Sequence, residues 1–95
     1  MSVTDTIKSI LAEDVFVEVP PGEMREDDSL RDVYGLDSIG FVELRVQSEQ
    51  RFGITIPDEE FTQESFATIR DLAALVSRLR EGAATVPTGA PGDPP

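Results

Sequence analysis

Apolar residues recur at helical spacing near both ends of the chain, and polar residues take the opposite positions. The first such segment runs from Thr4 to Val15 and the last from Thr68 to Arg80. Each pattern predicts an amphipathic helix with one face toward a core. Ser2 or Thr4 suits the first N-cap, and Gly82 suits the last C-terminal stop. The apolar positions are Ile7, Ile10, Leu11 and Val15 in the first helix, and Ile69, Leu72, Ala73, Val76 and Leu79 in the last.

The middle of the chain predicts one more long helix and one short one. A helix from Asp37 to Arg51 would begin at a capping aspartate and stop at Gly53. Pro57 followed by the acids of 58–60 predicts one or two further helical turns. No segment alternates with period 2 for long enough to make a convincing strand. The expected fold is therefore all-α, a small four-helix bundle of three longer helices and one short helix.

Two segments without helical periodicity complete the chain. A long first loop runs from about Val17 to Leu36 and should be partly ordered, since helix connections are usually shorter. Residues 83–95 contain four prolines and two glycines. Such a composition cannot offset the entropy of ordering, so we expect one domain over residues 1–82 and a disordered tail over 83–95. The expected core anchors of the loop are Leu30, Val33, Tyr34 and Leu36.

Composition removes most catalytic chemistry. The chain of 95 residues has neither cysteine nor histidine, which excludes a usual zinc site, a disulfide, a thiol nucleophile and a Ser-His triad. Its net charge of −11 would repel nucleic acid and anionic membranes, so the expected partners are basic patches on other proteins. No secretory signal and no run of about 18 apolar residues is present, which predicts a soluble, cytoplasmic protein.

Hydroxyls are the remaining reactive groups, and two serines directly follow an aspartate in the sequence. Asp28-Ser29 lies in the long loop, with room for little more than a turn around it. Ser38 would be the first helical residue after the capping Asp37, beside the positive end of the helix dipole, where a phosphate is stabilised. An Asp-Ser pair at a helix start is also a common cap, so the dipeptide alone is weak evidence.

A longer stretch around Ser38 resembles the attachment motif of acyl carrier proteins. Gly35-Leu-Asp-Ser-Ile-Gly-Phe-Val-Glu-Leu44 is similar to the Gly-x-Asp-Ser-Leu motif of that family, which a helix containing Val-Glu-Leu follows. Asp28-Ser29-Leu30 resembles the acid-x-Leu element that precedes the motif. Phe52-Gly-Ile-Thr-Ile-Pro-Asp-Glu-Glu60 resembles the family's Phe-x-x-x-Ile-Pro-Asp-Glu-Glu stretch. The resemblance spans about Thr4 to Arg80.

The resemblance implies a carrier rather than an enzyme. Ser38 would carry 4′-phosphopantetheine, installed from coenzyme A by a phosphopantetheinyl transferase that also recognises Asp37. Acyl groups would be bound as thioesters to the terminal thiol of the arm. Because Met1 lies only a few residues before the first helix, we expect a free-standing carrier, and a monomer. Its further partners would be an acyl-loading enzyme and condensing and tailoring enzymes with basic docking patches.

The resemblance also implies a partner surface. In family members, acids at the positions of Glu43, Asp58, Glu59 and Glu60 meet those basic patches. Such contacts mostly raise association rates and weaken with salt. Ile39, Val42 and Val46 are spaced to form an apolar strip beside the acids, although any of them can be core, and a core or mixed role is favoured for Ile39.

Departures from the family pattern favour a specialised carrier. Gln47 and Ser48 are polar where fatty-acid carriers are often apolar, which weakens a cavity for a long alkyl chain and favours polyketide or related biosynthesis. Gly40 lies in the first helical turn, where glycine lowers helix stability by about 1 kcal/mol relative to alanine. Either the missing side chain lets a partner or the arm approach closely, or glycine at this position is neutral drift. Phe41 is either a core anchor, which we favour, or a residue lining the arm.

Other functions remain as alternatives. A peptidyl or aminoacyl carrier would resemble Gly-Gly-x-Ser at the attachment loop and be less acidic, and a housekeeping fatty-acid carrier is a further option within the class. Outside it, an unmodified acidic helical adaptor would only bind proteins. A serine hydrolase lacks an activating base, since Lys8 is the sole lysine. Asp27 to Ser38 does not follow the ligand spacing of a calcium loop, so no metal site is expected.

Overall fold

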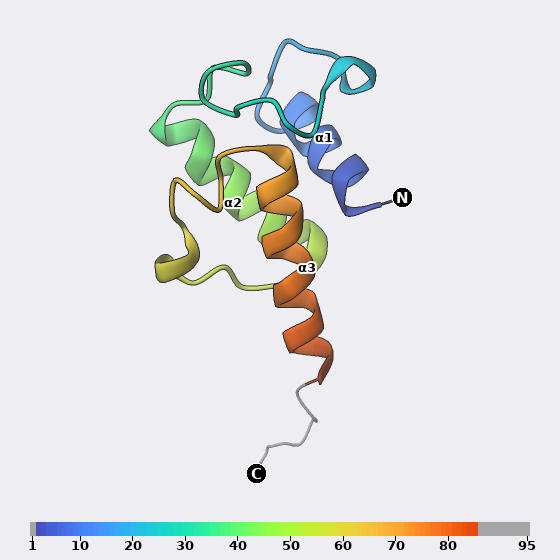
Figure 1. Cartoon of the computed structure of the whole chain (residues 1–95), viewed down its shortest axis with the longest axis vertical. Helices are drawn as coiled ribbons and strands as arrows, with labels where there is room; N and C mark the ends of the chain where they lie inside the picture. Colours follow the sequence, from blue (N-terminus) through green and yellow to red (C-terminus); the bar gives the residue numbers. More distant parts are fainter. Residues whose placement is uncertain (1, 86–95) are drawn as a thin grey trace.

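The computed structural model describes residues 2–85, in which three α-helices and two short 3-10 helices follow one another. The α-helices are α1 (Val3–Glu13), α2 (Ser38–Phe52) and α3 (Ile69–Thr85). The 3-10 helices are η1 (Pro21–Glu23) and η2 (Asp58–Glu60). In Figure 1, α1 runs up toward the long first loop, and α2 and α3 run down from it. Between residues 2 and 85 the nearest approach to a sheet is one isolated bridge joining Ser29 to Thr68, so the predicted all-α fold is confirmed.

Several helix ends differ from the predicted ones. α1 begins after the Ser2 cap and ends at Glu13, before Val15, because the chain turns sharply at Phe16, whose φ is 65°. The predicted short helix is a single 3-10 turn. α3 continues through Gly82 to Thr85, since Gly82 does not adopt the positive φ that would end a helix there. The remainder of the predicted tail, 86–95, lies outside the described residues.

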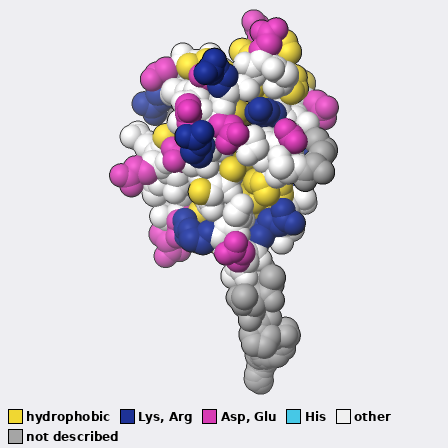
Figure 2. Space-filling model, turned by 45° about the vertical axis from the view of Figure 1, so that its right-hand side comes forward, with side chains coloured by type: hydrophobic (Ala, Val, Ile, Leu, Met, Phe, Trp, Pro, Cys, Tyr) yellow, Lys and Arg dark blue, Asp and Glu magenta, His cyan; other side chains and the backbone are white. Residues whose placement is uncertain are grey.

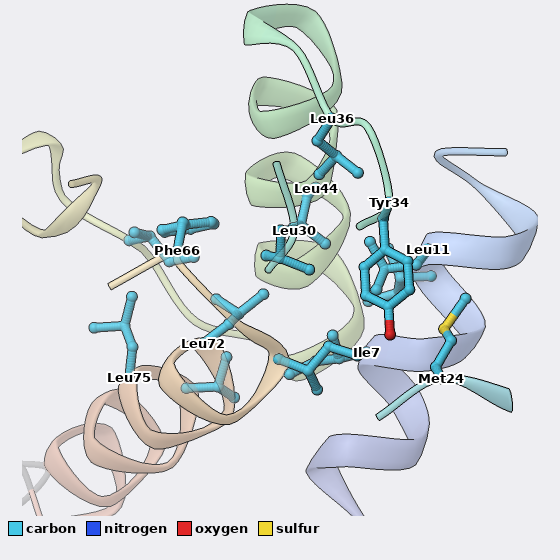
Figure 3. Packing of buried hydrophobic residues seen from close by; sticks show 14 residues of the cluster. Ile7, Leu11, Met24, Leu30, Tyr34, Leu36, Leu44, Phe66, Leu72 and Leu75 are labelled. Carbon is cyan, nitrogen blue, oxygen red and sulfur yellow. The ribbon is translucent and has the colours of Figure 1, made fainter. Parts of the chain in front are cut away.

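The core lies where the three α-helices meet beneath the long loop (Figure 3). The predicted apolar face of α1 is buried at three positions, and α3 buries Leu75 as well as Ile69, Leu72 and Val76. Of the four predicted loop anchors, three are buried, but Val33 is 52 % exposed. Its neighbour Tyr34, which was also a predicted anchor, points inward. The fully buried side chains are Ile7, Ile10, Leu11, Leu30, Leu44, Ile56, Ile69, Leu72, Leu75, Val76 and Ser48.

Backbone hydrogen bonds tie the long loop to the start of α3. The Leu30 N–H donates to the Ala67 carbonyl at 2.9 Å, and the Arg70 N–H donates to the Glu26 carbonyl at 3.0 Å. The loop is therefore ordered across the end of the bundle at which α2 and α3 begin (Figure 1). This order agrees with the expectation drawn from its length.

Tyr34 fixes the fold of the loop from within. Its hydroxyl oxygen accepts the Arg25 N–H at 3.1 Å and donates to the Asp28 carboxylate at 3.0 Å. Burial raises the pKa of the Tyr34 phenol above its ordinary value of 10.0; the hydrogen bond from the Arg25 backbone opposes this in part, and the Asp28 carboxylate raises the pKa further. The protonated phenol is thus the form that the folded loop binds.

An N-cap and a C-cap define the ends of α2. Asp37 Oδ1 accepts the Gly40 N–H at 2.8 Å, and Gly53 closes the helix in the left-handed region with φ 65°. Both ends were predicted from the sequence. Helix α2 therefore starts at Ser38, and nothing in this arrangement uses the Ser38 side chain.

Replacing Tyr34 by phenylalanine should destabilise the fold by about 1 kcal/mol at neutral pH, because two loop hydrogen bonds are lost. The pKa of Tyr34 is raised in the folded state, so its contribution is complete below the unfolded value of 10.0 and is lost as pH rises through the folded value. Urea unfolding of the native protein and of Tyr34→Phe, at neutral pH and above pH 10, measures the destabilisation and its dependence on pH. If the two proteins differed in unfolding free energy by the same amount at both pH values, this role of Tyr34 would be contradicted.

Replacing Ser48 by alanine should stabilise the protein by about 1 kcal/mol. Ser48 is fully buried, and its hydroxyl has no hydrogen-bond partner within the described chain, so it bears an uncompensated desolvation cost. Ser9→Ala, on the partly exposed side of α1, is the matched control and should gain only the few tenths of a kcal/mol of helix propensity. The urea midpoints of the two variants are compared with that of the native protein. A lower midpoint for Ser48→Ala would disprove the conclusion that the buried Ser48 hydroxyl destabilises the fold.

Candidate functional site

Ser38 stands exposed at the N-terminal end of α2. Its hydroxyl makes no hydrogen bond or ion pair with any residue from 2 to 85, since Asp37 alone caps the helix. The free N–H groups of the first turn and the helix dipole give this position a partial positive charge. An anionic group esterified to Ser38 would be stabilised there.

Two glycines allow the chain to enter α2 at this point. Gly35 has φ 71°, a left-handed conformation that side chains rarely adopt, and it turns the loop toward the helix. Gly40 packs closely: a Cβ there would lie 3.3 Å from Leu36 Cγ and 3.4 Å from Asp37 Oδ1. A larger residue at position 40 would therefore press against the capping loop, so packing gives Gly40 a role that the sequence alone did not reveal.

A groove of about 370 Å³ opens beside Ser38, between the start of α2 and the segment 61–67. Its aromatic wall includes Phe61 and Phe66, whose rings meet edge to face with centroids 5.0 Å apart. Phe41 is partly buried against the core and also lines the groove, so both alternatives drawn from the sequence hold. The remaining lining residues are Ser29, Arg31, Asp32, Ser38, Val42, Thr62, Gln63 and Ala67.

The second Asp-Ser pair occupies a different environment. Ser29 is half-buried, its Oγ accepts the Asp32 N–H at 3.0 Å, and its backbone pairs with Thr68. The Ser29 oxygen is thus engaged in holding a turn of the long loop. Of the two serines, only Ser38 combines exposure with a helix N-terminus.

The predicted acids are only partly gathered on one face. Asp58 pairs with Arg45 of α2 at 2.9 Å, which places η2 beside the middle of that helix. Glu60 pairs with Arg78 of α3 at 3.3 Å. Glu43 accepts from the Gln47 amide at 2.8 Å, and Glu59 is exposed. Arginines of the chain itself therefore offset two of the four negative charges.

The predicted apolar strip on α2 faces solvent. Ile39 is 79 % exposed, Val42 50 % and Val46 36 %. The expectation of a core or mixed role for Ile39 is wrong. Positions 41, 44, 48 and 52 face the bundle, and position 39 lies on the other side of the helix.

Sequence reasoning missed several residues around Ser38. Phe61 and Phe66 were not singled out, nor was Arg31, because only the fold brings the loop and the segment 61–67 beside α2. Phe16 was also missed. It stands in the apolar run Val15-Phe16-Val17, which is typical of a core segment, yet it is 79 % exposed.

The surface is charged and mixed in sign. On the face shown in Figure 2, acidic and basic side chains lie among one another with small apolar patches between them. None of the helices within residues 2–85 is long and apolar enough to cross a membrane.

Solved structures with a similar fold include an acyl carrier protein. The holo acyl carrier protein of Nitrosomonas europaea superposes with a TM-score of 0.73 at 22 % identity, covering 82 % of this chain and 95 % of that one. That likeness concerns the fold. A chain in the crystal structure of an engineered Bradyrhizobium japonicum glycine:[carrier protein] ligase, complexed with a carrier protein from Agrobacterium tumefaciens and ATP, gives a TM-score of 0.71 at 29 % identity, covering 80 % and 97 %.

Curated relatives agree with the structural likeness. The acyl carrier protein of Wolinella succinogenes is 36 % identical over 76 residues, covering 80 % of this chain and 95 % of the relative. The D-alanyl carrier protein of Streptococcus suis is 42 % identical over 79 residues, covering 83 % and 96 %. Residues 5–76 match the family model described as the phosphopantetheine attachment site. The chain therefore belongs to the family of phosphopantetheine-binding carrier proteins, which are non-catalytic and bear a 4′-phosphopantetheine prosthetic group.

Proposed function

We propose that Ser38 carries the 4′-phosphopantetheine arm and that the protein presents acyl intermediates for polyketide or related specialised biosynthesis. The observation that carries this proposal is the exposed Ser38 hydroxyl, which stands at the capped positive end of α2 and opens onto a groove. When bound, the arm supplies the terminal thiol that this cysteine-free chain lacks.

The residues around Ser38 fit such a group. The hydroxyl is outside every hydrogen bond of the helix start, so it is available for esterification. The dipole of α2 favours the phosphodiester charge. Arg31 lines the same groove, is exposed and forms no ion pair with residues 2–85, so it can offset that charge.

The groove lining supports an oxygenated acyl group over a long alkyl chain. Its aromatic wall offers apolar packing, while Ser29, Thr62 and Gln63 place hydroxyl and amide groups along it. Such groups can hydrogen-bond to carbonyl or hydroxyl oxygens of a bound chain. Ser29 and Thr62 already accept the N–H groups of Asp32 and Ser65, so their hydroxyls remain available only as donors. An alkyl chain would cover the Gln63 amide without offering it a partner, at a cost in affinity.

An aminoacyl group is the second candidate. The D-alanyl carrier protein of Streptococcus suis is 42 % identical, and one solved neighbour is from a complex of a glycine ligase with a carrier protein. Asp32 lines the groove and offers a carboxylate to an ammonium group. The Gly-Leu-Asp-Ser sequence at positions 35–38 favours the acyl group.

Partner enzymes would approach the exposed side of α2. Ile39, Val42 and Val46 offer an apolar strip, and Glu43 and Glu59 offer carboxylates to basic patches. Asp58 and Glu60 contribute less, because Arg45 and Arg78 already pair with them. We propose a phosphopantetheinyl transferase, an acyl-loading enzyme and condensing and tailoring enzymes as partners of a cytoplasmic monomer, and no nucleic acid, given the charge of −11.

Incubation with coenzyme A and a broad-range phosphopantetheinyl transferase should add one arm to the native chain and to Ser29→Ala. Ser38→Ala should gain none, because no other hydroxyl shares its place at the helix end. Intact-protein mass spectrometry measures the gain. A Ser38→Ala protein that still takes up an arm would overturn the proposal, as would a native chain that never does.

From the corresponding coenzyme A thioesters, the same transferase can load the acetoacetyl, butyryl or D-alanyl form of 4′-phosphopantetheine onto ¹⁵N-labelled protein, and chemical shifts then report where each group lies. We expect the acetoacetyl form to shift Thr62 and Gln63 more than the butyryl form does, since only its additional carbonyl can accept a hydrogen bond there. Larger shifts for the D-alanyl form, lost in Asp32→Asn, would instead favour the aminoacyl candidate.

A further inference from the structure

Arg45 joins the middle of α2 to the segment that forms one wall of the groove beside Ser38. Its Nη2 nitrogen donates to the Ile56 carbonyl and to the Asp58 carboxylate, the latter at 2.9 Å. Its guanidinium carbon lies 4.8 Å from the centre of the Phe61 ring, so the cation faces the ring. One side chain of α2 thus engages a carbonyl, a carboxylate and an aromatic ring of the same segment.

The course of this segment gives the position of Phe61 in the groove. The Ile56 N–H donates to the Glu49 carboxylate at 2.7 Å, which places residue 56 beside the second half of α2. The chain then returns toward the start of α3, where residue 67 bonds to the long loop (Figure 1). Phe61 is the first residue of this segment to line the groove, so it forms the end of the groove away from Ser38.

The Phe61 ring is held between a cation and a second ring. The Arg45 guanidinium lies against it, and Phe66 meets it edge to face. Arg45 does not itself line the groove, so it acts on this wall from outside. Its side chain is only 21 % exposed, whereas that of Asp58 is 97 % exposed. The surface ion pair is therefore weak, and the contacts of Arg45 with the carbonyl and the ring are the sheltered ones.

The backbone of residues 57–66 depends on side chains for its place in the fold. In the part of the chain that the structure describes, its hydrogen bonds to other backbone groups join residues three or four apart within the segment. Two arginines hold the segment from the helices: Arg45 from α2, and Arg78, which pairs with Glu60 at 3.3 Å, from α3. Of these two, Arg45 is the one that also faces a ring of the groove wall.

The end wall limits what the groove can hold. The groove volume of about 370 Å³ is near the lower end of the range for ligand pockets, roughly 300–1,000 Å³. A long alkyl chain would have to push the Phe61 ring aside and lie against the Arg45 guanidinium and the Ile56 carbonyl. Methylene groups offer those polar groups no hydrogen bond, so entry of the chain is unfavourable.

We propose that Arg45 is a positioning residue that closes the far end of the groove by holding Phe61 in place, and so restricts the groove to short acyl groups. The inference deepens the proposed function and rests on it, because it names the length of the group carried at Ser38. Arg45 selects the acyl group through the aromatic ring that it holds.

The absence of cysteine allows a direct test, because Ser38→Cys supplies the single thiol of the full chain. Alkyl methanethiosulfonates then attach a propyl or a decyl group to position 38 through a disulfide. With Arg45 present, the decyl form should unfold at the same thermal midpoint as the propyl form, because the end wall leaves the additional carbons in solvent.

Arg45→Met in this background removes the cation and its hydrogen bonds but keeps an unbranched side chain. The decyl form of this variant should unfold about 4 °C or more above its propyl form, because apolar surface is buried beyond Phe61. Amide shifts should extend to residues 56–61. Arg78→Met is the matched control: it loses the same charge and frees Glu60 but leaves the ring in place, so its two forms should unfold alike.

Two further variants test the wall without Arg45→Met. Arg45→Lys keeps the charge but lacks the planar group that faces the ring, so it should admit the decyl group as well. Phe61→Ala removes the wall itself and should do the same with Arg45 intact. Equal midpoints of the decyl and propyl forms in these variants would overturn the proposal. A decyl gain in the chain with Arg45 and Phe61 intact, or an equal gain in Arg78→Met, would also overturn it.

The disulfide probes keep this inference apart from the proposed function, since they need neither transferase nor coenzyme A. A native chain that takes up no arm, with a decyl gain confined to the Arg45 and Phe61 variants, would refute the proposed function and leave the end wall standing. Arm uptake at Ser38 together with a decyl gain in the chain that retains Arg45 would refute the end wall alone.

Discussion

The hydrogen bond from the Gly40 N–H to the Asp37 carboxylate, 2.8 Å long, decides where α2 begins. Because Asp37 is the cap, Ser38 is the first helical residue and stands at the positive end of the dipole. The bond requires that the loop fold closely onto the first turn. The left-handed Gly35 and the missing side chain of Gly40 make this approach feasible. The exposed hydroxyl is thus a consequence of backbone geometry over six residues.

The rest of the bundle holds this helix end in place. Leu36, just before the cap, and Leu44, two turns into α2, are buried in the common core, while Leu30 and Tyr34 fasten the loop that leads to them. The same loop contributes Arg31 and Asp32 to the groove beside Ser38. The core therefore does more than stabilise the chain, since it brings a loop, a helix start and the segment 61–67 to one point.

Much of this arrangement could be predicted from the sequence. Periodicity located the helices, Asp37 and Gly53 marked the ends of α2, and the motif singled out Ser38. Exposure was harder to predict: Ile39 and Phe16 are apolar but face solvent, because their orientation depends on which neighbouring positions the core already fills. Gly82 did not stop α3, since glycine permits a C-cap without imposing one. The groove residues come from separate segments and no local pattern links them.

The central claim is that one hydroxyl, at the start of α2, is the attachment point. Digestion of the native protein after treatment with transferase and coenzyme A, followed by tandem mass spectrometry, locates the added phosphopantetheine on a residue. The account predicts a single modified position, Ser38, with Ser29 and every threonine unmodified. An arm on any other residue, or no arm on the folded chain, would contradict it.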